Sequence, residues 1–208
     1  MANATEEPKY TVVRQYDGFE IREYAPYIVA EVVVPGPSDE AGNQGFRILA
    51  GYIFGKNKGE RRMSMTAPVA QSPAPVKLEM TAPVTQTAAE GAYVVQFMMP
   101  SEYRLDTLPE PMDPRIRLKQ VAGGRFAVIR YSGTWSRSNY QEHLEALERG
   151  VQAAGLRTTG SPIYSRYNPP FTPWFLRRNE IWLQLAAGDG AGRSRGSSGA
   201  ASHAQPRR

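Results

Sequence analysis

The sequence contains no cysteine and only two histidines, His143 and His203. Without a cysteine sulfur there are no disulfides, thiolate metal sites or thiolate-ligated haem, and haem cannot be attached covalently as in c-type cytochromes. Two histidines are also too few to favour a zinc or non-haem iron site built on paired imidazoles. These absences argue against metal-dependent catalysis.

Long apolar runs are missing as well. No segment approaches the roughly 18 or more apolar residues of a membrane-spanning helix, so we expect no membrane span. Residues 1–7 lack both the basic and the apolar region of a secretory signal peptide. As written, the sequence predicts a cytoplasmic protein, and a periplasmic location is the alternative if a signal segment precedes the given start.

Positive charge is concentrated at the C-terminal end. The net charge is +5, of which residues 188–208 supply +3 through four arginines and one aspartate, leaving +2 for the rest. This end is rich in Gly, Ser and Ala and has no large apolar residue, so it cannot bury enough surface to order itself. We expect a flexible N-terminus at 1–8, one domain at 9–187 and a disordered basic tail at 188–208. We expect no nucleic-acid partner, although weak adhesion of the tail to nucleic acid or an anionic membrane stays open.

The pentapeptide Met-Thr-Ala-Pro-Val occurs twice, at 65–69 and again at 80–84. Each copy combines residues that favour β-structure with a proline, which has no N–H to donate to a sheet ladder. Each copy is therefore expected to form an edge strand or the end of a strand.

Alternating and β-branched runs predict strands, and two amphipathic segments predict helices. The order of strands, helix and strands occurs twice along the chain. Two such halves can each bury one face by closing against each other. We therefore predict an α+β fold, a distorted antiparallel β-barrel of two similar strand-helix-strand halves flanked by two helices. The expected strands are Tyr10–Tyr16, Phe19–Tyr24, Tyr27–Val34, Tyr93–Met99, Ile116–Val121, Phe126–Tyr131, Ile163–Tyr167 and Glu180–Leu185, and the expected helices are Ser38–Phe54 and Ser138–Ala154.

The two predicted helices differ in their apolar surface. The first has apolar residues around more than half its circumference, which suggests that it covers the sheet and something else. The second is expected to begin with a capping box at Ser138–Gln141 and to end at Gly155. Its apolar face is formed by Tyr140, Leu144, Leu147 and Val151.

Six motifs along the chain form a specific combination. They are Tyr-Asp-Gly-Phe-Glu-Ile-Arg at 16–22, Tyr-Ile-Phe-Gly at 52–55, the doubled Met-Thr-Ala-Pro-Val, Phe-Met-Met-Pro at 97–100, Tyr-Asn-Pro-Pro at 167–170 and Arg-Arg-Asn-Glu at 177–180. Together they resemble the motifs of bacterial SOUL haem-binding proteins. The resemblance covers about residues 9–187 and implies a distorted barrel with two helices, similar to effector-binding domains of the gyrase-inhibitor type. It also implies non-covalent binding of haem or another tetrapyrrole.

The resemblance also implies where a tetrapyrrole would lie: against the first helix and the loop before the last strand. Half of the apolar helix residues must nevertheless face the barrel, and Arg178 can equally pair with Glu180. The residues expected at the site are Phe46, Leu49, Ala50 and Ile53 on the helix, Met63 beyond it, Phe171, Trp174 and Leu176 on the loop, and Arg177 and Arg178 for the propionates.

The sequence offers few candidates for an axial iron ligand. His143 is the one histidine within the predicted domain, and its place beside the apolar face of the second helix favours an ordinary half-exposed residue. We expect haem binding for transport, buffering or sensing without strong axial coordination. Two alternatives stay open: a binding module for another apolar small molecule, and an enzyme using Glu79, Glu142 or Glu180 to modify a tetrapyrrole, for example by removing its iron.

Overall fold

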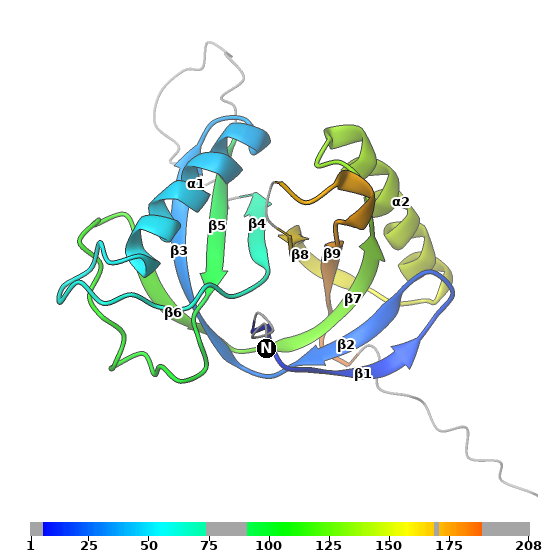
Figure 1. Ribbon diagram of the computed structural model, residues 1–208. Coiled ribbons are helices and arrows are strands. Elements are labelled where there is room, and N and C mark those ends of the chain that lie inside the picture. The colour runs from blue at the N-terminus through cyan, green and yellow to red at the C-terminus, as the bar shows by residue number, and fades with distance from the viewer. Residues whose placement is uncertain (1–5, 74–90, 169–170, 189–208) are drawn as a thin grey trace, which may run out of the picture.

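The computed structural model describes residues 6–73, 91–168 and 171–188. Nine strands, two α-helices and one short 3-10 helix follow one another within these ranges (Figure 1). In chain order they are β1 (Tyr10–Gln15), β2 (Glu20–Tyr24), β3 (Tyr27–Pro35), α1 (Ser38–Ile53), β4 (Val69–Pro73), β5 (Ala92–Met98), β6 (Arg117–Val121), β7 (Gly124–Tyr131), α2 (Arg137–Ala153), β8 (Thr158–Arg166), η1 (Trp174–Leu176) and β9 (Asn179–Leu185).

The strands form one antiparallel sheet in the order β1-β2-β7-β9-β8-β4-β5-β3-β6. The sheet curls into a half-barrel with α1 over one arm and α2 over the other, and β4 and β8 run between them (Figure 1). This arrangement confirms the predicted α+β fold with two helices beside a curled antiparallel sheet.

The two halves exchange their first strands. The first half runs from β2 to β5 through α1, and the second runs from β6 to β9 through α2. The first strand of each half pairs with the second strand of the other half, β2 with β7 and β6 with β3. At the centre of the sheet β4 pairs with β8, where Ala70 faces Ser165. The sequence repeat therefore corresponds to a structural repeat whose halves depend on each other for pairing.

Helix α1 lies very close to the sheet because it has a glycine where the two elements meet. A Cβ atom at Gly45 would come within 2.5 Å of the Val95 side chain on β5. Leu49, Tyr52 and Ile53 are then buried against β3 and β5. The buried Tyr52 hydroxyl donates a hydrogen bond to the carbonyl of Pro109 at 2.8 Å, and its burial raises its pKa to about 12. Leu49 and Ile53 on one face of the helix, and Tyr52 on another, therefore all belong to the core.

The N-cap of helix α2 is Ser136, two residues before the predicted cap at Ser138. The side chain of Ser136, and not that of Ser138, accepts a hydrogen bond from the backbone N–H of Asn139 at 3.3 Å. Leu144, Leu147 and Val151 of this helix are buried against β7 and β9, as predicted.

The face of the sheet opposite the helices carries a buried polar network. The Glu180 carboxylate accepts hydrogen bonds from Arg22 at 2.9 Å, from the Tyr167 hydroxyl at 2.7 Å and from the Trp182 indole at 2.9 Å. Arg178 binds the same carboxylate at 2.8 Å and reaches Glu7 at 2.9 Å. Glu6 and Glu7, which the sequence assigned to a flexible terminus, thus contact the segments just before β4 and β9, since the Glu6 carbonyl also accepts from the Ala67 N–H at 2.9 Å.

The first Met-Thr-Ala-Pro-Val copy ends at Val69, where β4 begins. The prediction of a strand end is therefore confirmed there. Its alternative, an edge strand, is wrong, because β4 lies between β8 and β5. The second copy lies outside the described residues. Within the described ranges, no helix is long and apolar enough to cross a membrane.

Candidate functional site

A cleft separates the two helices above the central strands β4 and β8. It consists of two cavities of about 240 and 400 Å³ that share Gln71 and Trp135. We call the smaller one the apolar chamber and the larger one the aromatic chamber. The apolar chamber is lined by Gly42, Asn43, Phe46, Met65, Thr66, Ala67, Val69, Gln71, Trp135, Arg166, Tyr167 and Asn168, and the aromatic chamber by Gly36, Pro37, Gln71, Ser72, Pro73, Gly91, Tyr93, Trp135, Ser136, Arg137, Tyr140, Gln141, Pro162 and Tyr164.

The apolar chamber lies beside α1. Phe46 is held there by an edge-on contact with the Phe97 ring, with 5.3 Å between the ring centroids. Met65 and Val69 complete the apolar wall from the segment that leads into β4. Gly42 makes room at the border of the two chambers, because a Cβ atom there would lie 2.7 Å from the Gln71 amide oxygen. This chamber presents an apolar surface that suits the face of a flat, apolar ligand.

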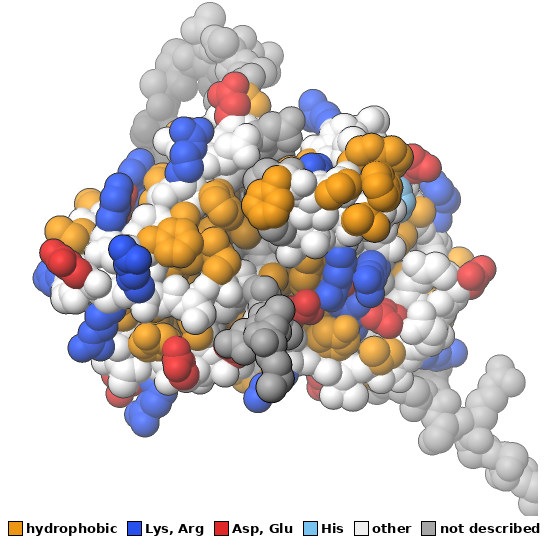
Figure 2. Space-filling model, viewed as in Figure 1, with side chains coloured by type: hydrophobic (Ala, Val, Ile, Leu, Met, Phe, Trp, Pro, Cys, Tyr) orange, Lys and Arg blue, Asp and Glu red, His pale blue; other side chains and the backbone are white. Residues whose placement is uncertain are grey.

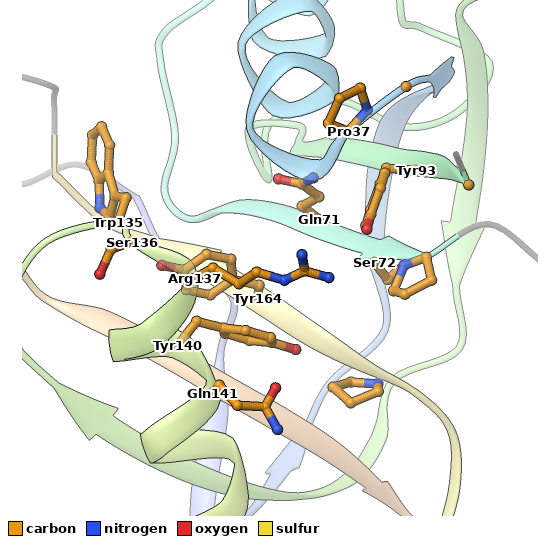
Figure 3. Close-up of a pocket in the computed structure, with 14 residues that line it drawn as sticks. Pro37, Gln71, Ser72, Tyr93, Trp135, Ser136, Arg137, Tyr140, Gln141 and Tyr164 are labelled. Atoms are coloured by element: carbon orange, nitrogen blue, oxygen red, sulfur yellow. The ribbon is translucent and has the colours of Figure 1, made fainter. Parts of the chain in front are cut away.

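The aromatic chamber lies beside the start of α2 (Figure 3). Tyr140 and Tyr164 contact each other there, with ring centroids 4.7 Å apart, and Tyr93 stands across the cavity on β5. Burial is the main cause that raises the pKa of Tyr140 to about 12. The phenol is therefore neutral at physiological pH, so it can donate a hydrogen bond.

Trp135 forms the wall between the chambers. Its indole N–H donates to the side-chain oxygen of Asn179 at 2.9 Å, which fixes the ring at the start of β9. The guanidinium carbons of Arg166 and Arg177 lie 4.8 and 4.3 Å from its ring centroid. Such cation–π contacts position the arginine side chains over the ring.

The predicted helix residues divide between the cleft and the core. Phe46 lines the apolar chamber. Leu49, Ile53 and Met63 are instead buried in the core beneath α1, and Ala50 packs against the same core. The periodicity of α1 turns Leu49 and Ile53 toward β3 and β5, and none of these four residues lines either chamber.

The predicted loop residues lie beside the cleft on the surface. Phe171, Trp174 and Leu176 are 86, 58 and 64% exposed, and none of them lines either chamber. The loop is attached to the segment before α2 by a hydrogen bond from the Gly133 N–H to the Trp174 carbonyl at 3.0 Å. Apolar side chains gather over η1 and over α1 on this side of the molecule (Figure 2).

The two predicted loop arginines have different neighbours. Arg177 donates to the Thr172 carbonyl at 2.8 Å and stacks on Trp135, next to the cleft. Arg178 belongs to the buried network on the other face, where it contacts Glu180, Glu7 and the Tyr167 ring. The structure therefore shows the alternative that the sequence analysis left open for Arg178, a pair with Glu180.

His143 lies away from both chambers. Its ring stacks on Tyr131 with 4.1 Å between centroids, and its Nδ1 is 2.7 Å from the Asn139 carbonyl. The described residues contain no cluster of three or more His, Asp and Glu side chains that could hold a metal ion. His143, the one histidine that the sequence offered as an axial ligand, is a half-buried helix residue that lines neither chamber.

Three carboxylates were considered for acid–base chemistry. Glu180 lies in the opposite network: its burial would raise its pKa, but Arg22 and Arg178 more than offset this and lower it. Glu142 is exposed on α2 and does not line the chambers. Glu79 lies outside the described residues. Of the described residues, no aspartate or glutamate lines either chamber.

Sequence reasoning missed most of the cleft wall. Trp135, Arg137 and Arg166 were not singled out, and Tyr140 was assigned to the core alone. One signal was available: a tryptophan directly before a helix start is costly to leave exposed and often has a partner for its indole N–H. The aromatic chamber is built by residues from five separate segments, and the pairing of β4 with both β5 and β8 brings the two halves together there.

Comparison with known proteins places this geometry in a family. The model of the family described as "SOUL heme-binding protein" matches residues 5–184. The chain belongs to this family. It is 29% identical over 171 residues to Heme-binding protein 2 of Mus musculus, covering 81% of this chain and 78% of the relative. It is also 29% identical over 175 residues to Heme-binding protein 1 of Xenopus laevis, covering 79 and 82%.

Solved structures support the same fold for this SOUL family member. The C-terminal domain of EcmrR matches with a TM-score of 0.60 at 12% identity, covering 85% of this chain and 98% of that domain. A hydrolase from Listeria innocua matches with a TM-score of 0.52 at 13% identity, covering 89 and 94%. At these identities the likeness concerns the fold alone.

Proposed function

We propose that this protein binds haem or a related tetrapyrrole non-covalently in the cleft between α1 and α2. The observation that carries the proposal is the cleft wall, which is apolar at Phe46, Met65 and Val69 and aromatic around Trp135. Membership of a family described as heme-binding, and the names of its relatives, support this ligand class.

The residues of the cleft fit the chemistry of a tetrapyrrole. A porphyrin needs an apolar slot for its ring and polar or cationic groups for its propionates. The two chambers adjoin at Trp135 and form one elongated cleft, comparable with ligand pockets of about 300–1,000 Å³. Burying about 400 Å² of macrocycle contributes on the order of 10 kcal/mol. After the costs of association, and with charge pairing to the propionates, we expect about −8 kcal/mol, an affinity near the micromolar range.

Recognition in this proposal depends on the ring and its carboxylates and not on strong axial coordination of iron. No histidine among the described residues lines either chamber, and Met65 is the one thioether on the described wall. When haem is bound, its iron supplies any redox or gas-ligand chemistry. The protein residues contribute burial and orientation, which suits transport, buffering or sensing.

A second candidate ligand is a different apolar small molecule. The described wall of the cleft has aromatic and apolar groups that would contact many flat ligands. The proposal assigns no catalytic residue, because the described wall offers no aspartate, glutamate or histidine as a general acid or base.

Absorbance titrations with ferric haem and with iron-free protoporphyrin test this proposal. Phe46→Asp should weaken the binding of both compounds by about 10- to 100-fold, because it places a charge where about 1.5–3 kcal/mol of aromatic burial is gained. Phe54→Asp is the matched control: Phe54 is 57% exposed just after α1 and lines neither chamber. Equal loss in both variants, or no saturable binding by the unaltered protein, would contradict the proposal.

A further inference from the structure

We propose that Arg137 and Arg166 form a carboxylate-binding subsite in the cleft, so that the protein selects tetrapyrroles with free carboxylates over esterified or cationic ones. The inference rests on the proposed function and specifies its ligand class. It follows from the charges of the cleft wall, the surroundings of Arg166 and the position of Arg137.

The described wall of the cleft carries charge of one sign. Arg166 lines the apolar chamber and Arg137 lines the aromatic chamber. Neither an acidic side chain nor a third basic one is among the described residues of either wall. A ligand with a positive charge would face two guanidinium groups without a counter-ion, whereas a ligand with carboxylates would find complementary charge.

Arg166 is held in place by aromatic rings and has a donor without an acceptor. Its guanidinium carbon lies 4.8 Å from the Trp135 ring centroid and 5.1 Å from that of Tyr164. Its Nε is buried, and no described residue accepts a hydrogen bond from it. A buried donor without a partner is costly, and a carboxylate entering the apolar chamber would remove this cost.

Arg137 reaches into the aromatic chamber from the start of α2. Its guanidinium extends across the cavity between Tyr140 and Gln71 (Figure 3). No described carboxylate pairs with it. The neutral Tyr140 phenol lines the same cavity, so a donor in addition to the guanidinium is available to one carboxylate, whereas the Gln141 amide donates to Glu145 at 3.0 Å.

Several other arginines of the protein are already paired with carboxylates. Arg22 and Arg178 bind Glu180 at 2.9 and 2.8 Å on the opposite face of the sheet. Arg115 binds Asp113 at 2.6 Å on the surface. The two cleft arginines differ from these. No described carboxylate of the protein pairs with them, so a carboxylate of the ligand can.

The two arginines lie on either side of the Trp135 wall. Arg166 stacks on this ring, and Arg137 follows it by two residues in the chain. A tetrapyrrole with two carboxylate arms on one edge is the ligand that uses both groups while its ring covers the apolar wall. Esterification of the arms removes the charge and leaves the ring unchanged, so it isolates the role of the arginines.

The test compares three porphyrins of similar ring size: protoporphyrin, its dimethyl ester and a tetracationic porphyrin, all delivered from the same neutral detergent. Affinities are measured by absorbance for the unaltered protein, Arg137→Gln, Arg166→Gln and Arg166→Lys. Arg130→Gln is the matched control, because Arg130 is exposed on β7 and lines neither chamber. Circular dichroism verifies that each variant is folded.

The unaltered protein should bind the free acid at least about 10-fold more tightly than the ester, as expected for charge-assisted hydrogen bonds. It should bind the cationic porphyrin most weakly. Each Gln variant should reduce the preference for the acid by about 10-fold, because it weakens acid binding much more than ester binding, and Arg166→Lys should keep part of the preference. Arg130→Gln should change nothing.

Equal affinity of the unaltered protein for acid and ester would overturn the subsite and leave the proposed function standing. So would equal loss of acid and ester binding in the Gln variants, or an Arg130→Gln effect as large as theirs. If Arg166→Gln does not fold, Arg137→Gln and Arg166→Lys still decide the question. Absence of saturable binding for all three porphyrins would overturn the proposed function and the subsite together.

Discussion

Arg22 and Glu180 form an ion pair of 2.9 Å between residues 158 positions apart in the chain, and both side chains are almost completely buried. The pair connects β2 with β9 across β7. Tyr167 and Trp182 donate to the same carboxylate, so its oxygens are satisfied by several donors. Such a pair is sensitive to loss of either member because the other charge would stay buried.

Glu180→Gln should therefore destabilise the fold by about 3–5 kcal/mol. Urea unfolding measures the change. The control is Glu110→Gln, which breaks the exposed pair with Lys58 and should cost no more than about 1 kcal/mol. Similar losses in the two variants would show that burial of Glu180 has little energetic consequence.

The same pair predicts a pH dependence of stability. Burial would raise the pKa of Glu180, but Arg22 and Arg178 more than offset this, so its folded-state pKa lies below the ordinary value. The stabilisation is then fully present above the unfolded-state pKa of about 4.3 and is lost as the pH falls toward the folded-state pKa. Between pH 5 and 3, the free energy of unfolding should fall further in the unaltered protein than in Glu180→Gln. Parallel pH profiles would contradict this assignment.

Gly45→Ala should destabilise the protein by about 1–3 kcal/mol, because the added methyl group would meet Val95 at 2.5 Å and force α1 away from β5. Gly51→Ala is the control in the same helix. Its methyl group would meet only the flexible Lys56 side chain at 3.1 Å, so the gain in helix propensity should leave stability unchanged or raise it by up to about 1 kcal/mol. Thermal unfolding compares the two variants, and a stabilised Gly45→Ala would refute the close packing of α1.

His143→Ala should leave the affinities for haem and protoporphyrin unchanged, because His143 stacks on Tyr131 and lines neither chamber. Absorbance spectra of the haem complex measure this directly. Loss of the Soret shift in the variant, with protoporphyrin binding retained, would identify His143 as an iron ligand and would place the site elsewhere.

Trp174→Asp tests the exposed loop. The side chain is 58% exposed and does not line the chambers, so the substitution should not affect the free energy of unfolding by more than about 0.5 kcal/mol. We expect it to weaken protoporphyrin binding less than Phe46→Asp does. A loss as large as that of Phe46→Asp would extend the site from the cleft onto the loop, as the family resemblance implied.

Local patterns predicted the fold well, because the strands and helices are amphipathic and bounded by turn residues. The predicted helix Ser38–Phe54 differs from α1 by one residue at its C-terminal end. The sequence puts the N-cap of α2 at Ser138, because Ser136 and Ser138 can both act as caps. Only the hydrogen bond from the Asn139 N–H to the Ser136 side chain identifies Ser136 as the cap. Family resemblance and helix periodicity also indicated Phe46, which lines the cleft.

The rest of the site depends on contacts between distant segments. Leu49 and Ile53 share a helix face with Phe46, and only the position of β3 and β5 shows that they are used for the core. Arg166 is positioned in the cleft by its contact with the Trp135 ring, and Trp135 lies 31 positions earlier in the chain. Such neighbours follow from the pairing of strands that are distant in the chain, here β3 with β5 and β9 with β7 and β8, which no local pattern encodes.

The position of the ligand can be measured most directly through the methionine methyl groups, observed by NMR in protein labelled at these positions. Met65 lines the apolar chamber, whereas Met63 is buried in the core and Met112 is 66% exposed outside both chambers. Saturating protoporphyrin should shift the Met65 resonance, assigned with Met65→Leu, through the ring current of the macrocycle, with a one-to-one end point, and leave Met112 unchanged. Saturable binding that moves another methionine and leaves Met65 in place would contradict a tetrapyrrole site between α1 and α2.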